Sequence, residues 1–511
     1  MRQRAKFGKN LKFSSYKLRL DTDAVLRYNR NGLFKIFEIL ARKDIKFVKN
    51  VTKMLRCLIF PKMKGKLMFG FKFLGKTHIP HNKNTAELSP VKMTPPKEVL
   101  LSMSQHIGAP ATPIVKVGDE VKVGQLVAEP SGYVSSPIYA SVSGKVTKIE
   151  TYLRPDGRSV PAIRIESDGL MTADEGITPP EVTDFDSFVQ AIRSSGLVGL
   201  GGAGFPTSVK LDAVKKGGIH TIVINGAECE PYITSDTRTM LDRSESIFDG
   251  ITILEKYIPT AEKFIFGIEK NKPECIEEMA RIFQDNSKVS IIPLPSLYPQ
   301  GAEKVLIYNT TGLVVPEGKL PADVGVLVIN VTSLAVLANY IKTGMPLIEK
   351  CVTVDGSAVN EPKNVIAPIG TSIREIIEFA GGLTEDAGKV LFGGPMMGIS
   401  ACSLDEPISK TTNAITVFNV KDSTEREASA CIHCGRCVSA CPIGLNPTAF
   451  SKALNYGTEE KMAKLEEASI NLCMECGCCS FVCPASRPLV QNNRLGKAAL
   501  RDYKAHQSTL K

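Results

Sequence analysis

Two runs of cysteines near the end of the sequence have the spacing of iron–sulfur ligands. Each run places three cysteines at intervals of three residues and a fourth four residues later, directly before a proline. In tandem runs of this kind, the first three cysteines bind one [4Fe–4S] cluster and the fourth binds the other cluster. We therefore predict two [4Fe–4S] clusters, one held by Cys431, Cys434, Cys437 and Cys483, and one held by Cys473, Cys476, Cys479 and Cys441.

Other uses of these cysteines agree less well with their spacing and context. A structural zinc site usually takes four thiolates from two Cys-x2-Cys pairs, whereas three cysteines at three-residue intervals with a distant fourth suit a cubane. Disulfides need an oxidising compartment, and nothing in the sequence indicates export. Cys478 lies between two predicted ligands and breaks the pattern, so we expect it to be a bystander that faces the cluster loop.

A glycine-rich segment in the middle of the chain has the composition of a phosphate-binding loop. Residues 196–210 read GLVGLGGAGFPTSVK, and we expect a helix with Pro206 at its first position. Glycine lets the backbone approach a ligand closely, and the helix N-terminus offers free N–H groups to a phosphate, to which Lys210 adds a charge. The segment is neither a Walker A loop nor a Rossmann fingerprint, because it lacks the Gly-Lys-Ser/Thr ending and no strand precedes it. A plain tight turn is the alternative interpretation.

A strand that runs into two carboxylates is the second candidate. Residues 223–232 read VINGAECEPY. We expect Glu228 and Glu230 to face the same side of the strand end, where they would suit ribose hydroxyls or the edge of a flavin ring. A solvated acidic turn is the alternative.

The remaining chain supplies the elements that position these residues. Residues 110–150 read as short β runs, similar to the barrel-sandwich fold of biotinyl and lipoyl carriers. The hairpin 131–137 lacks the lysine that a carrier must present, so a structural or docking role is left. Residues 184–340 alternate helix and strand signals, as in an α/β domain that binds ligands at the carboxyl ends of its strands. We predict helices over 188–195, 240–257, 274–283 and 300–308, strands over 221–224, 264–268, 289–292 and 324–329, and two helices within 447–467.

The charge of the chain is unevenly distributed. Of its 511 residues, the first 62 carry 17 Lys and Arg against 4 Asp and Glu, which leaves 46 against 49 for the rest. The body is therefore not basic, and we predict no nucleic-acid partner. The basic segment has an amphipathic pattern that indicates a helix on an anionic membrane surface or on a partner protein. A disordered extension, or a start codon placed too far upstream, is the alternative. No apolar run reaches 18 residues, so we predict no membrane span.

Taken together, these motifs resemble the C subunit of the Rnf ion-translocating NAD:ferredoxin oxidoreductase. The resemblance covers about residues 70–495 and rests on LGGAGFPT from Leu200, INGAECEPY from Ile224, YPQGAEK from Tyr298, FGGPMMG from Phe392 and the two cysteine runs. The central module is also similar to the NADH-oxidising subunit of respiratory complex I, although Leu200 and Ala227 stand where that subunit has Arg and Asp.

The resemblance implies a set of ligand-binding residues. Gly199, Gly201, Gly202, Gly204 and Lys210 would hold the phosphate and ribityl chain of a non-covalent FMN. Asn225, Glu228 and Asn330 would surround the rest of the flavin, and Phe205, Glu230 and Glu303 would line the nicotinamide side. No side chain is predicted to act as a catalytic acid or base.

The resulting prediction is a multidomain α/β protein. We expect a basic extension (1–65), a barrel-sandwich β domain (66–170), a Rossmann-like flavin- and NADH-binding α/β domain (184–345), a small β-grasp (SLBB-like) domain (346–400) and a helical ferredoxin-type domain with two [4Fe–4S] clusters (420–495).

The predicted function is electron input at the cytoplasmic side of the cell membrane. The chain would be a peripheral subunit of the ion-translocating complex that exchanges a hydride with NAD(H) at FMN and passes single electrons through the clusters. Its partners would be the integral membrane and iron–sulfur subunits of that complex and, indirectly, ferredoxin or a quinone-side partner. The alternative is a non-catalytic electron wire that binds no nucleotide.

Overall fold

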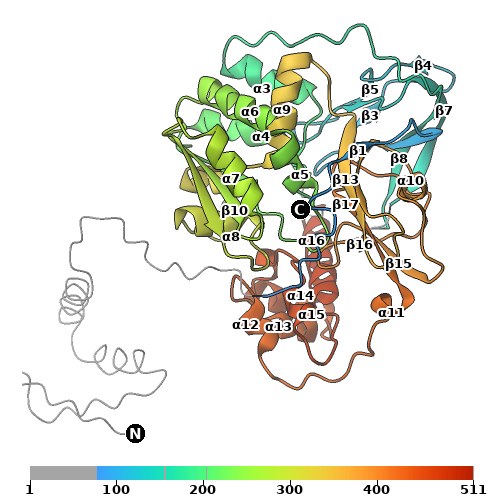
Figure 1. The fold of residues 1–511 in the computed structure, drawn as a ribbon. Coiled ribbons are helices and arrows are strands. Elements are labelled where there is room, and N and C mark those ends of the chain that lie inside the picture. The colour runs from blue at the N-terminus through green and yellow to red at the C-terminus, as the bar shows by residue number, and fades with distance from the viewer. Residues whose placement is uncertain (1–76, 155–156, 203, 510–511) are drawn as a thin grey trace, which may run out of the picture. The chain divides into compact units, whose positions relative to one another are not determined.

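The structure is a computed structural model that describes residues 77–154, 157–202 and 204–509. The predicted basic extension lies outside the described residues. The described part combines sheets and helices in the predicted α/β multidomain fold (Figure 1).

A parallel four-stranded sheet forms the centre of the α/β domain. Its strand order is β11–β10–β9–β12, with β9 (Thr221–Gly226), β10 (Lys263–Glu269), β11 (Val289–Leu294) and β12 (Val326–Asn330). Strand β9 sends Ile222 and Ile224 into the core on one face and Val223 into the core on the other. A parallel sheet is buried on both faces, which explains why these strands read as continuous apolar runs.

The helices of this domain are α3 (Phe185–Ser194), α4 (Thr207–Asp212), α5 (Ser235–Asp242), α6 (Ser244–Tyr257), α7 (Pro273–Ile282), α8 (Glu303–Thr311) and α9 (Val331–Thr343), with short 3₁₀ turns at Ala213–Lys216 and Pro321–Val324. Two predictions are wrong in detail. The helix expected over 240–257 is two helices, because Arg243 between them has a non-helical φ of −129°. Pro206 is the N-cap of α4 instead of its first residue.

The second sheet is mixed, and its order is β1–β14–β13–β17–β15–β16. It contains β1 (Val91–Lys92), β13 (Glu349–Asp355), β14 (Lys363–Pro368), β15 (Ala387–Phe392), β16 (Ile399–Ser400) and β17 (Ala414–Asn419). Helix α10 (Ile373–Phe379) packs into its core and begins at Ser372, whose side chain accepts a hydrogen bond from the Glu375 amide. The sheet therefore extends beyond residue 400, because β17 pairs with both β13 and β15.

The barrel-sandwich region has two small antiparallel sheets, ordered β2–β8–β7–β4 and β3–β5–β6. Their strands are β2 (Glu98–Ser102), β3 (Thr112–Pro113), β4 (Glu120–Val121), β5 (Leu126–Glu129), β6 (Ile138–Tyr139), β7 (Gly144–Leu153) and β8 (Ser159–Ser167). The hairpin that lacks a carrier lysine joins β5 to β6.

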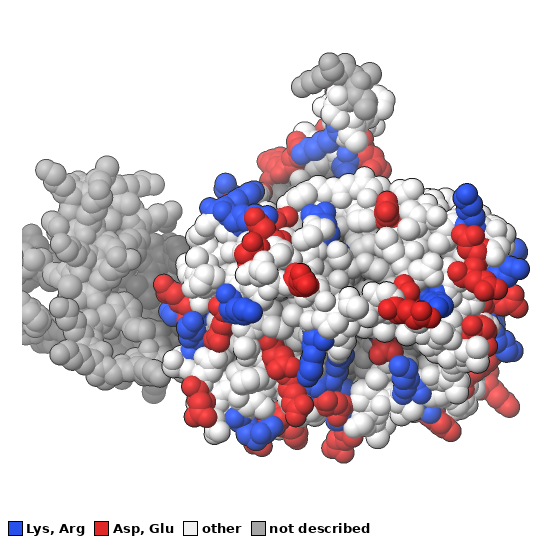
Figure 2. Space-filling view, turned by 90° about the horizontal axis from the view of Figure 1, so that it is seen from above, with Lys and Arg blue, Asp and Glu red and all other residues white. Residues whose placement is uncertain are grey.

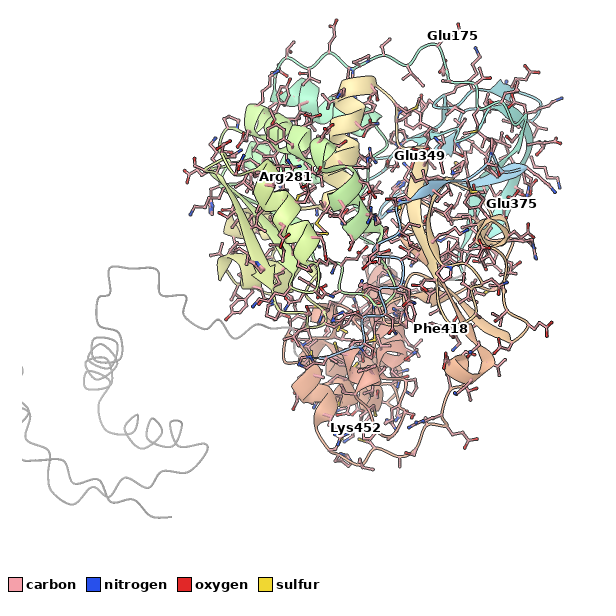
Figure 3. All side chains as sticks on the ribbon, in the orientation of Figure 1. Glu175, Arg281, Glu349, Glu375, Phe418 and Lys452 are labelled. Atoms are coloured by element: carbon pink, nitrogen blue, oxygen red, sulfur yellow. The ribbon has the colours of Figure 1, made fainter. Side chains whose placement is uncertain are left out.

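Helices form the regular structure of the chain after residue 419, where the cysteine runs lie. They are α11 (Val420–Ser423), α12 (Arg436–Ala440), α13 (Pro447–Ala453), α14 (Thr458–Glu467), a 3₁₀ turn (Ile470–Leu472), α15 (Cys478–Phe481) and α16 (Leu489–Thr509). Figure 3 shows Lys452 of α13 within this helical group. The two helices predicted within 447–467 are confirmed as α13 and α14. None of the described helices is long and apolar enough to cross a membrane.

The surface charges are mixed. Figure 2 shows Lys and Arg interspersed with Asp and Glu over the visible face of the described part. This distribution agrees with the nearly balanced charge of the chain after residue 62.

Candidate functional site

Each set of four cysteines that the spacing assigns to one cluster surrounds one cavity. The first cavity, of about 120 Å³, is lined by Cys431, Cys434, Cys437 and Cys483. The second, of about 20 Å³, is lined by Cys441, Cys473, Cys476 and Cys479. In both, the fourth cysteine comes from the other run, as the crossed assignment requires.

The two cysteine loops have the same local fold. Gly435 and Gly477 follow the second cysteine of each run and adopt φ values of +72° and +80°, a region that glycine enters without strain. Each glycine turns the chain into a short helix, α12 or α15, that carries the third cysteine. Among the described residues, no three His, Cys, Asp or Glu side chains converge closely enough to hold a single metal ion. A cubane spreads its thiolates over four irons, so a four-cysteine cavity fits a [4Fe–4S] cluster.

The two cavities differ in exposure. Cys434 of the first cavity is exposed, whereas Cys476 and Cys479 of the second are buried. The second cavity lies against the α/β domain, because the neighbouring Cys478 sulfur lies 3.9 Å from the carbonyl oxygen of Tyr298. Cys478 is thus turned towards Tyr298, although it also borders the second cavity.

The glycine-rich loop connects α3 to α4 beside the carboxyl end of β12. Its ends are closed by two backbone hydrogen bonds, from the Gly199 amide to the Phe205 carbonyl (2.8 Å) and from the Gly204 amide to the Gly199 carbonyl (3.1 Å). Gly201 and Gly202 are exposed. A Cβ on Gly201 would lie 3.2 Å from the amide nitrogen of Asn330, whereas a Cβ on Gly202, at φ +116°, would have no protein atom within 4 Å. The loop therefore presents open backbone of the kind that a phosphate-bearing ligand can approach.

Two predicted ligand-binding residues, Lys210 on α4 and Glu303 at the start of α8, form an ion pair. The ammonium of Lys210 lies 3.1 Å from a carboxylate oxygen of Glu303 and donates a 2.9 Å hydrogen bond to the Val328 carbonyl. The two side chains are partly exposed, so both charges remain accessible to a bound nucleotide.

Asparagine side chains secure the strand ends. The amide nitrogen of Asn225 donates to the Gly301 carbonyl (3.0 Å), and that of Asn330 donates to Asp236 (2.8 Å). Asn330 also caps α9, because its side-chain oxygen accepts from the Ser333 amide.

The two carboxylates of the second motif do not face the same side, contrary to the expectation. Strand β9 ends at Gly226, so the alternation of a strand does not apply to Glu228 and Glu230. Glu228 turns inward and accepts hydrogen bonds from the Asp236 amide (2.7 Å) and from the amide (3.2 Å) and hydroxyl (2.8 Å) of Thr237, at the start of α5. Its role in this structure is to hold that helix terminus.

Glu230 instead holds a loop of the β-grasp region. Its carboxylate accepts hydrogen bonds from the Met396 amide (2.6 Å), the Met397 amide (3.0 Å) and the Tyr298 hydroxyl (3.1 Å). Burial raises the pKa of Glu230, and these three donors oppose the rise. A Cβ on Gly394 would lie 2.3 Å from the Glu230 side chain, so only glycine fits there.

The same loop, residues 394–398, contacts the second cysteine cavity. A Cβ on Gly477 would lie 2.6 Å from the Met396 carbonyl oxygen. Glu230 is therefore connected to the turn that follows Cys476 through a single loop.

Sequence reasoning missed a half-buried lysine in this region. The ammonium of Lys83 donates 2.8 Å hydrogen bonds to the carbonyls of both Glu228 and Glu230. Burial lowers its pKa to about 8, which the neighbouring Glu228 opposes. No periodicity or motif marks this lysine in the sequence, because its partners lie about 150 residues away.

The second motif also packs against the β-grasp sheet. The ring of Tyr232 lies edge-on to that of Phe418 on β17, with 5.4 Å between the ring centroids. Figure 3 labels Phe418 on this strand.

Family models match most of the described chain. The Nuo51 FMN-binding domain matches residues 192–339, and the RnfC barrel sandwich hybrid domain matches residues 71–170. The SLBB domain matches residues 351–400, and the 4Fe-4S dicluster domain matches residues 427–486. Their order along the chain agrees with the predicted fold class.

A solved structure with a partial likeness is an NAD+-reducing [NiFe]-hydrogenase in the H2-reduced state. It is 20% identical, with a TM-score of 0.44, over 62% of this chain and 63% of that chain.

Curated relatives match over most of their length. The C subunit of the proton-translocating ferredoxin:NAD(+) oxidoreductase complex of Clostridium ljungdahlii is 43% identical over 74% of this chain and 83% of that protein. The C subunit of the Na(+)-translocating complex of Acetobacterium woodii is 42% identical over 83% of this chain and 96% of that protein. The C subunit of the ion-translocating oxidoreductase complex of Rhodobacter capsulatus is 39% identical over 84% of this chain and 83% of that protein. The chain therefore belongs to the family of the C subunits of Rnf-type ion-translocating oxidoreductase complexes.

Proposed function

We propose that this chain is the electron-input subunit of a membrane-bound, ion-translocating NAD:ferredoxin oxidoreductase. The observation that carries the proposal is the continuous connection from the nucleotide motifs to the second cysteine cavity, through Glu230 and the 394–398 loop. The names of the curated relatives and the matching FMN-binding and dicluster models support it.

The residues present fit a flavin site. The open backbone at Gly201 and Gly202 would receive the phosphate end of FMN, with Gly199 and Gly204 closing the loop and the ammonium of Lys210 nearby. When bound, FMN exchanges a hydride with NAD(H) and releases electrons singly to the two [4Fe–4S] clusters. Asn225 and Asn330 would fix the strand ends around the flavin, and Glu228 would act indirectly by holding α5.

The exposure of the cysteines suggests an order for the clusters. The buried second cavity lies beside the α/β domain, and the first opens to the surface at Cys434. We therefore place the second cluster between the nucleotide site and the first cluster, and the first cluster next to another protein of the complex.

The rival function is an electron wire that binds no nucleotide. Leu200 and Ala227 favour this alternative, because they depart from the flavin-binding motifs of complex I. The match of the Nuo51 FMN-binding domain to residues 192–339, which include the glycine-rich loop, favours the nucleotide function. Flavin content of the purified full chain distinguishes the two functions.

Nucleotide-driven electron transfer depends on Glu230. Replacing it with glutamine removes one charge from the predicted nicotinamide side and weakens its bonds to Met396 and Met397. We expect Glu230→Gln to retain FMN and both clusters, but to slow NADH-driven cluster reduction about tenfold, the scale of one hydrogen bond to a charged group. Stopped-flow absorbance with NADH measures this rate. An unchanged rate would remove Glu230 from the pathway.

We further propose that the chain lies on the cytoplasmic side of the membrane and is held there by the other subunits of the complex. Since no described helix can span a bilayer, we expect high salt or alkali to release the chain from native membranes. Immunoblots of washed membranes, with an integral membrane protein of the complex as the retained control, test this. Release by detergent alone would contradict it. Protease digestion of sealed vesicles of known orientation tests the cytoplasmic side.

A further inference from the structure

Two buried lysines from outside the α/β domain hold the glycine-rich loop. Lys350 of β13 donates a 3.2 Å hydrogen bond from its ammonium to the Leu200 carbonyl. Lys410, between β16 and β17, donates 2.7 Å hydrogen bonds to the carbonyls of Gly196 and Pro137. Their exposed fractions are only 4% and 1%.

Burying these ammonium groups is costly. Burial lowers the pKa of Lys350 to about 8 and that of Lys410 to about 7. The partners of Lys410 are two carbonyls and the Ser136 hydroxyl, and no carboxylate of the described residues pairs with it. Burying an ammonium without a counter-ion is unfavourable, and here the hydrogen bonds to carbonyl and hydroxyl oxygens offset part of that cost.

The position of Lys350 fixes the direction of one loop amide. In a trans peptide, the carbonyl of Leu200 and the N–H of Gly201 point in opposite directions. Because that carbonyl points inward to a buried ammonium, the Gly201 N–H points away from the interior, and Gly201 is exposed. The Leu200 amide is also fixed, since it donates a 3.0 Å hydrogen bond to the Ser333 hydroxyl.

The barrel-sandwich region completes the support of the loop. The Ser136 hydroxyl donates to the Gly196 carbonyl (3.1 Å), and the Ile107 amide donates to the Gly204 carbonyl (3.0 Å). A Cβ on Gly196, at φ +70°, would lie 3.2 Å from the Lys410 ammonium. The hairpin 131–137, which lacks a carrier lysine, thus supports the start of the glycine-rich loop through Ser136.

We propose that Lys350 is a positioning residue that turns the Leu200 carbonyl of the glycine-rich loop inward and the Gly201 amide towards the flavin phosphate. Lys410 holds the start of the loop at Gly196, where the next amide, that of Leu197, donates to the Ser195 hydroxyl. This inference rests on the proposed function. It also gives the barrel-sandwich region a task in flavin binding.

Comparing FMN with riboflavin tests the proposal, because riboflavin lacks the phosphate. The full chain, stripped of flavin, is titrated with each by fluorescence quenching. We expect Lys350→Met to weaken FMN about tenfold, the scale of a charged hydrogen bond, while riboflavin affinity stays within about twofold. A merely structural role of Lys350 would weaken both flavins equally, and that result, or an unchanged ratio of the two affinities, overturns the assignment.

Two further variants keep the test decisive. Lys363→Met is the matched control, because Lys363 also lies in the β-grasp sheet and bonds a carbonyl, that of Phe379, but does not touch the loop; it should bind both flavins normally. If Lys350→Met fails to fold, Ser333→Ala serves instead, because it removes only the hydroxyl that accepts the hydrogen bond of the Leu200 amide. It should likewise weaken FMN more than riboflavin. Full FMN binding by Gly202→Val would count against the flavin site itself. Loss of flavin from Gly202→Val together with normal FMN binding by Lys350→Met would count only against the role of Lys350.

Discussion

Replacing Cys476 with serine should lower the iron content of the purified chain from about eight to about four, because a [4Fe–4S] cluster needs four thiolates. Cys476 is one of the four predicted ligands that line the second cavity, which Cys478 also borders, and it is buried. Replacing Cys478, two residues later, should leave about eight iron and eight acid-labile sulfides, because its sulfur is turned towards the Tyr298 carbonyl. Anaerobic iron and sulfide analysis measures both.

The crossed assignment has its own test. Cys441→Ser should remove the cluster of the second cavity and Cys483→Ser that of the first, although each residue belongs to the other run. Electron paramagnetic resonance of each reduced variant shows which signal remains. The assignment fails if Cys441→Ser and Cys434→Ser lose the same signal. Zinc in place of iron in the wild-type chain would refute both clusters.

The cysteine sets could be predicted because their signal is local. Three-residue spacing, a glycine after the second cysteine and a proline after the fourth occur twice within about 50 residues. Each loop is built by its own backbone, so neighbouring residues suffice to describe it. The strands of the α/β domain were predictable for a similar reason, since their apolar runs reflect burial on both faces of a parallel sheet.

The partners of the two carboxylates could not be predicted in this way. Glu228 and Glu230 are two residues apart, yet one binds the start of α5 and the other binds a loop about 166 residues later in the chain. The place of β1 in the β-grasp sheet is another long-range pairing, to β14. Such contacts depend on how domains pack, which the local sequence does not encode.

The buried and half-buried lysines were missed for a further reason. Lysine is usually exposed, so Lys83, Lys350 and Lys410 read as ordinary surface residues. Their burial depends on carbonyls supplied by distant segments. These lysines now link the second motif and the glycine-rich loop to the other domains.

The glycine-rich loop is tested most directly at Gly202. Replacing Gly202 with valine should empty the flavin site, because the residue lies where we expect backbone to approach FMN closely. A Cβ there would meet no protein atom within 4 Å, so loss of flavin would not come from a clash inside the protein. Both clusters should remain, since the cysteines lie more than 200 residues away in sequence. Flavin released from the denatured chain and iron content measure the two outcomes.

A control variant at Gly318 distinguishes two causes of flavin loss in Gly202→Val, which are steric exclusion of the flavin and strain in the backbone. Gly318 also has a positive φ, of +71°, is exposed, and would meet no atom within 4 Å if it carried a Cβ. Valine is strained at both positions, but Gly318 lies outside the predicted site, so Gly318→Val should keep its flavin. Equal flavin loss in the two variants would mean that strain alone lowers binding. If Gly202→Val binds FMN stoichiometrically and still reduces its clusters from NADH, this loop is not the flavin site, and the electron-wire function becomes the better account of the chain.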